Sequence, residues 1–100
     1  MGAYEEQKSL YADVQRALWT EWDPIGLNAM DPPWPSDEYD GYAAQVLRAL
    51  NSGGGEQGLA KVLQEIERER MEIDRSFAEC VQAARRIRSV LRWRDPGAAT

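Results

Sequence analysis

The chain has 100 residues, of which 43% are hydrophobic and 29% charged, a balance typical of one globular domain rather than of a disordered segment. It carries a net charge of −5, no histidine and one cysteine. Catalytic triads that need histidine, zinc sites of the Cys/His type and internal disulfides are therefore excluded. We expect a single domain over residues 1–100, with a frayed tail from about residue 96.

Apolar runs are only a few residues long, and the acidic N-terminal segment has no apolar core of the kind that signal peptides need. We therefore expect a cytoplasmic protein with no membrane partner. Charge is distributed unevenly: residues 1–74 have 6 Lys and Arg against 15 Asp and Glu, whereas residues 75–100 have 6 Arg against 2 acids. Most of the chain should repel nucleic acid, while its C-terminal segment could attract it.

The first predicted element is a helix over residues 4–21. Its apolar side chains recur every four residues, at Leu10, Val14, Leu18 and Trp22. Asp23-Pro24 ends this helix, because a residue that precedes proline avoids the α region. Residues 23–36 contain four prolines together with large apolar side chains. This composition predicts a long ordered loop that is held against the helices by aromatic residues.

The second predicted helix is capped by Ser36 or Asp37 and runs to about Leu50. Its apolar stripe has 3-4 spacing and consists of Tyr39, Tyr42, Ala43, Val46, Leu47 and Leu50. Acidic residues in its first turn would interact favourably with the helix dipole. The run from Asn51 to Gly55 ends the helix with a flexible turn that lets the next helix pack antiparallel.

A third helix is predicted from about Glu56 to Met71, and a fourth, capped by Asp74, from Arg75 to about Arg94. The third has an apolar stripe of Leu59, Val62, Leu63 and Ile66, extended by Arg70 or Met71, and an outer face of Glu65, Glu67, Arg68 and Glu69. The fourth has a stripe of Ile73, Phe77, Cys80, Val81, Ala84, Ile87 and Leu91. The two could also form one continuous helix. Four amphipathic helices without a strand pattern predict an all-α bundle of about four helices, with an ordered Pro/Trp-rich loop between helices 1 and 2.

One candidate binding surface combines carboxylates with aromatic residues. Its acids are Asp31, Asp37, Glu38 and Asp40, and Trp34, Tyr39 and Tyr42 flank them. Aromatic anchors among carboxylates suit a basic partner, such as the active-site cleft of a nuclease. The structural interpretation is that the acids start a helix while the aromatics cover the core. Asp37 and Asp40 could supply two metal ligands, but the spacing of a calcium loop is missing, so we expect no metal site and no cofactor.

Two further charged sets suggest other functions. Glu69 and Glu72 have the i, i+3 separation with which all-helical nucleotide pyrophosphatases hold Mg²⁺, and Glu65 and Glu79 could complete such a site. The second pair of ligands is missing, so an ion-paired helix face is the simpler interpretation. The arginine set could make an adaptor for nucleic acid; its members are Arg75, Arg85, Arg86, Arg88, Arg92 and Arg94. The net negative charge argues against a dedicated nucleic-acid binder.

The segment Trp22-Asp23-Pro24-Ile25-Gly26 predicts a specific turn. Asp23 can accept hydrogen bonds from backbone amides of the turn, and Gly26 permits a backbone angle that other residues avoid. Cys80 falls on an apolar stripe and has no histidine partner, which predicts a small core residue.

Three sequence motifs in this order resemble a family of small bacterial all-helical proteins of largely unknown function. They are WDPIG at residues 22–26, DEYD with a following tyrosine at residues 37–42, and IERERM at residues 66–71. The resemblance covers residues from about 10 to 73. Where the family usually has glycine after the methionine, this chain has Glu72. Members of the family occur beside secreted polymorphic toxins and are interpreted as immunity proteins, so the resemblance implies a cytoplasmic toxin inhibitor.

These observations together favour a non-enzymatic immunity protein that binds the toxin domain of a cognate bacterial toxin and occludes its active site. The toxin would be a nuclease with a basic cleft, and the expected contact residues are Trp34, Asp37, Glu38 and Asp40. Nucleic acid is not the expected partner. A homo-oligomer stays open, because Tyr4, Tyr11 and Trp19 could supply an unused apolar stripe.

Overall fold

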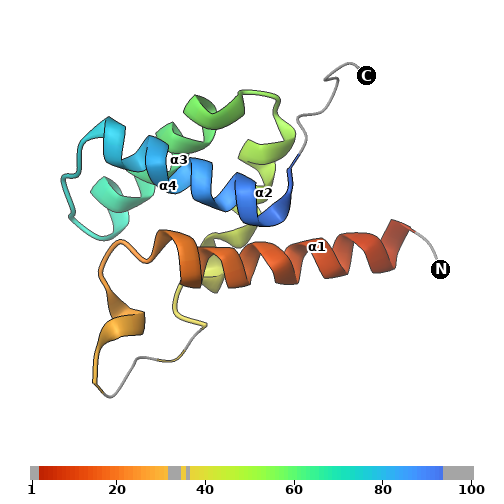
Figure 1. Ribbon diagram of the computed structural model, residues 1–100, viewed down its shortest axis with the longest axis horizontal. Coiled ribbons are helices and arrows are strands. Elements are labelled where there is room, and N and C mark those ends of the chain that lie inside the picture. The colour runs from red at the N-terminus through yellow and green to blue at the C-terminus, as the bar shows by residue number, and fades with distance from the viewer. Residues whose placement is uncertain (1–2, 32–34, 36, 94–100) are drawn as a thin grey trace.

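The computed structural model describes residues 3–31, 35 and 37–93 (Figure 1). Trp34, Ser36 and the tail predicted to fray lie outside these residues. Within the described part all regular structure is helical, so the predicted all-α bundle is confirmed. The long helices are α1 (Ala3–Ala17), α2 (Ala43–Asn51), α3 (Gly55–Arg70) and α4 (Phe77–Leu91), and the short ones are η1 (Leu18–Trp22), η2 (Leu27–Ala29) and η3 (Asp40–Tyr42).

Helix α4 packs against α3 and also against α1 and η1. In Figure 1, α1 and α4 run side by side in opposite directions. Each predicted stripe enters the core with its central members, including Val14 and Leu18, Val46 and Leu50, Leu59, Leu63 and Ile66, and Cys80, Ala84 and Ile87. Each large aliphatic side chain buried in this way stabilises the fold by about 1.5–3 kcal/mol. The small residues on α4 let its backbone lie close to its neighbours.

The first helix spans the predicted residues to within one position at each end, and it changes type before it ends. Its last turn, η1, is π-helical, and the amide of Asp23 donates to the carbonyl of Leu18 at 3.0 Å. Asp23 has a φ of 28° and Gly26 a φ of 78°, so the turn after η1 uses backbone angles that most residues avoid. The predicted role of Gly26 is confirmed.

The second helix begins later than predicted. Helix α2 starts at Ala43, and residues 37–42 form a turn followed by η3. Tyr39 is buried at the start of this segment, and its hydroxyl donates a hydrogen bond to Asp23. This tertiary bond, together with the low helix propensity of Gly41, accounts for the delay. Asp37, Glu38 and Asp40 therefore precede α2 and do not form its first turn.

Helices α3 and α4 are separate, because residues 71–76 are not helical. Ser76 caps α4 by accepting a hydrogen bond from the amide of Glu79 at 3.2 Å, so the prediction that Asp74 is the cap was wrong. Asp74 is exposed and forms an ion pair with Arg68 at 3.7 Å. Ile73 consequently lies in the connection and not on α4.

The C-terminal ends of α3 and α4 are each followed by a residue in the left-handed conformation that is not glycine. Glu72 follows α3 with a φ of 55°, and Arg92 follows α4 with a φ of 52°. The amide of Trp93 then donates to the carbonyl of Arg88 at 2.9 Å, a bond typical of the Schellman motif. This motif ends α4 at Leu91, three residues before the predicted end at Arg94.

The segment that contains η2 extends away from the helices, in orange in Figure 1. Leu27 is buried and fixes the segment to the core, as predicted for an ordered loop. Ile25 and Met30, two other apolar residues of this segment, are 45% and 41% exposed. Of the apolar residues considered for a dimer, Tyr11 and Trp19 pack partly buried against the core. Among the described residues, no helix is both long enough and apolar enough to cross a bilayer.

Candidate functional site

Three predicted contact residues lie together on the segment that leads into α2. Asp37 and Glu38 are exposed and Asp40 is half-buried. The amide of Asp40 donates to the carbonyl of Asp37 at 3.1 Å, which closes a tight turn. We call Asp37, Glu38 and Asp40 the acidic surface. The fourth predicted contact residue, Trp34, lies outside the described residues.

Tyr39 fixes the acidic surface to the core of the protein. Its side chain is fully buried, and its hydroxyl donates to Oδ1 of Asp23 at 2.6 Å. The same carboxylate oxygen accepts the amide of Leu27 at 2.8 Å, which confirms the predicted role of Asp23 in the turn. Burial, reinforced by the hydrogen bond to Asp23 and by its charge, raises the pKa of Tyr39 above its ordinary value. Asp23 and Tyr39 thus join the two ends of the loop between α1 and η3.

The ring of Tyr39 packs against further aromatic rings in the core. It packs against both Trp19 and Trp22, with centroid separations of 5.8 and 5.3 Å. Tyr42 meets Trp22 edge to face at 5.9 Å. Tilted and edge-to-face arrangements at these distances are favourable. The aromatics that the sequence placed beside the acids therefore hold the backbone of the acidic surface in place.

A hollow of about 200 Å³ opens between α1 and the acidic surface. Its lining consists of Gln15, Arg16, Trp19, Asp37 and Asp40. Partial burial, followed by the charge of Asp37, raises the pKa of Asp40. Within the described part of the chain, neither carboxylate has an ion-pair partner. We call this feature the Trp19 hollow.

The strongest polar cluster was missed by the sequence analysis. Glu67, predicted on the outer face of its helix, is fully buried. Its carboxylate accepts hydrogen bonds from Nε1 of Trp22 at 2.7 Å and from two guanidinium nitrogens of Arg75 at 2.8 and 2.9 Å. The thiol of Cys80 lies 3.6 Å away as a fourth donor. A buried carboxylate is tolerated only when it is paired in this way.

Helical spacing offered one signal for the burial of Glu67. Glu67 follows Leu63 by four residues and Leu59 by eight, which places it on the apolar face of α3. The partners could not be inferred, because Trp22 lies 45 positions away and Arg75 belongs to a non-helical connection. Burial, followed by the charge of Glu67, raises the pKa of the Cys80 thiol to about 11. The prediction that Cys80 is a core residue is confirmed.

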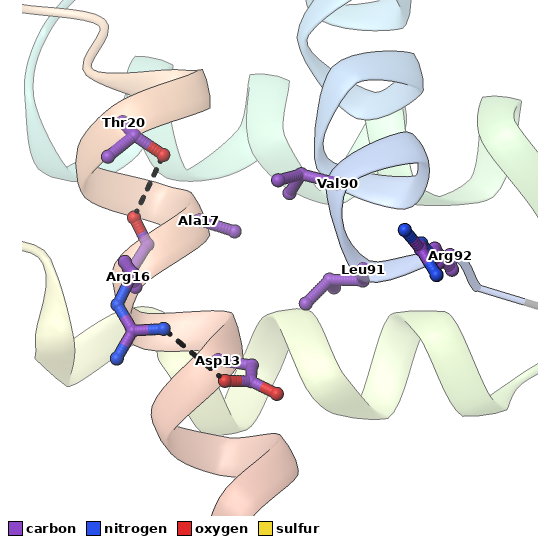
Figure 2. A pocket seen from close by; sticks show the side chains of 7 residues that line it. All are labelled: Asp13, Arg16, Ala17, Thr20, Val90, Leu91 and Arg92. Carbon is purple, nitrogen blue, oxygen red and sulfur yellow. Dashed lines mark hydrogen bonds and ion pairs between the residues drawn. The ribbon is translucent and has the colours of Figure 1, made fainter.

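A second hollow, of about 220 Å³, lies between α1 and the C-terminal end of α4. Figure 2 shows Val90 and Leu91 facing α1 across it, and Val90 is 54% exposed. Three of its polar residues are engaged with one another: Arg16 forms an ion pair with Asp13 at 3.5 Å, and Thr20, on η1, donates to the carbonyl of Arg16 at 3.2 Å. These internal bonds leave the hollow with few groups that could bind a ligand.

Several members of the arginine set bind acceptors within the chain. Arg75 pairs with the buried Glu67, and Arg85 makes a two-point ion pair with Glu56 at 2.9 and 3.0 Å. Two nitrogens of Arg86 donate to the backbone carbonyl of Glu21. Arg94 lies outside the described residues. These bonds tie α4 to its neighbours and reduce the cationic surface on which the nucleic-acid alternative depends.

The glutamates considered for magnesium do not form a cluster. Glu65, Glu69, Glu72 and Glu79 are all exposed, and none of them lines either hollow. In the described ranges, no three acidic or cysteine side chains lie close enough together to hold one metal ion, Asp37 and Asp40 included.

Comparison of the chain with protein-family models, with curated proteins and with solved structures finds no match. The geometry of the acidic surface and its support is therefore the basis for the functional assignment.

Proposed function

We propose that the chain is an immunity protein: a non-enzymatic, cytoplasmic inhibitor that binds a cognate bacterial toxin domain and covers its active site. The observation that carries the proposal is the acidic surface: Asp37 and Asp40 line a hollow, Glu38 is exposed beside them, and none of the three has an ion-pair partner among the described side chains. A basic partner would supply the missing positive charge. A nuclease fits this requirement, because its cleft must attract nucleic-acid phosphates.

The support beneath the acidic surface favours binding over a purely structural role. Asp23 and Tyr39 close the loop, and both Trp19 and Trp22 pack against the ring of Tyr39. A surface that is already ordered loses little conformational entropy on binding, so more of the contact energy appears as affinity. Carboxylates on such a surface can be aligned with the cations of a partner before contact.

The distribution of charge suggests how binding would begin. The acids of residues 1–74 outnumber the bases by 15 to 6, so this part of the chain attracts a basic surface over a distance. Attraction of this kind accelerates association and weakens when salt is added. Inhibition would then follow from steric coverage of the toxin cleft.

The proposal is tested by affinity capture with matched variants, using the tagged chain as bait in lysate of its native host. The first variant is Asp37→Lys with Asp40→Lys, which reverses the charge at two positions of the acidic surface. The control is Glu65→Lys with Glu69→Lys, which makes the same charge change at exposed positions of α3. We expect a protein domain that the first variant loses and the control retains.

The captured domain must also be toxic when expressed alone and harmless when expressed with the wild-type chain. If every captured protein is retained equally by both variants, or if co-expression fails to protect cells from the captured domain, the proposal is wrong.

A further inference from the structure

We draw no further inference here: the strongest candidate, the exposed apolar surface that Ile25 and Met30 form on the segment around η2, carries no proposal, because nothing in the structure shows what covers it.

Discussion

The indole nitrogen of Trp22 donates a hydrogen bond to the carboxylate of Glu67, 45 positions further along the chain, at 2.7 Å. Arg75 neutralises that carboxylate from the connection between α3 and α4. One buried side chain thus joins the end of η1, helix α3 and the end of the connection that leads into α4. Because Asp23 follows Trp22 directly, this cluster also sets the position of the turn that supports the acidic surface.

Replacement of Glu67 should be strongly destabilising. Glu67→Ala leaves the guanidinium of Arg75 and the indole of Trp22 without their acceptor, and removal of one partner of a buried ion pair costs about 3–5 kcal/mol. Urea denaturation should show this loss in the free energy of unfolding. The control is Glu69→Ala, at an exposed position of the same helix, with an expected change within about 0.5 kcal/mol. Similar losses in the two variants would contradict the account of the buried cluster.

Removal of one hydroxyl tests the closure of the loop. Tyr39→Phe deletes the hydrogen bond to Asp23, and a bond to a charged acceptor is worth about 1.5–3 kcal/mol. Tyr42→Phe is the control, because Tyr42 packs on Trp22 through its ring. We expect a clear loss of stability for Tyr39→Phe alone, together with faster amide exchange at Leu27. If amide exchange at Leu27 is unchanged, Asp23 and Tyr39 do not hold the turn.

Stability should decrease at alkaline pH. The pKa of Cys80 is about 11 in the folded chain against an ordinary value of 9.0, so between these values the unfolded state binds fewer protons and stability falls as pH rises. The raised pKa of Tyr39 acts in the same direction above pH 10. In urea titrations from pH 8 to pH 11, Cys80→Ala should reduce the slope by up to about 1.4 kcal/mol per pH unit. Parallel curves for wild type and variant would show that the thiol does not contribute.

One substitution should stabilise the chain. Glu72 has a φ of 55° at the end of α3, a conformation that glycine adopts without steric cost. Glu72→Gly should raise the free energy of unfolding by about 0.5–1 kcal/mol. Glu69→Gly, inside the same helix, should lower it by about 1 kcal/mol. A loss of stability in Glu72→Gly would mean that the left-handed turn is not strained.

Periodicity was sufficient to predict the long helices of this chain. The stripes of α1, α3 and α4 repeat at helical spacing, and their central residues are buried as that spacing requires. The start of α2 could not be predicted from its stripe, because the hydrogen bond from Tyr39 to Asp23 spans 16 positions and delays the helix. The end of α3 was predicted to within one residue, but the end of α4 at Leu91 was missed, because arginine is not typical of the left-handed position that Arg92 occupies.

The candidate site was predicted in composition but not in its geometry. The sequence placed Asp37, Glu38 and Asp40 near aromatics, yet it assigned them to a helical turn. Trp19, which lies 18 positions before Asp37 on η1, was not expected to share a hollow with Asp37 and Asp40. The burial of Glu67 was hidden by the charged residues beside it, since a run of alternating acids and arginines usually marks an exposed face.

The central claim is that the acidic surface recruits a basic toxin domain, and the association rate tests it most directly. At low salt, stopped-flow mixing with the captured domain should give an association rate constant at least about tenfold lower for Asp37→Lys with Asp40→Lys than for Glu65→Lys with Glu69→Lys. The difference should shrink as salt is added. Equal association rates for the two variants at low salt would contradict the claim.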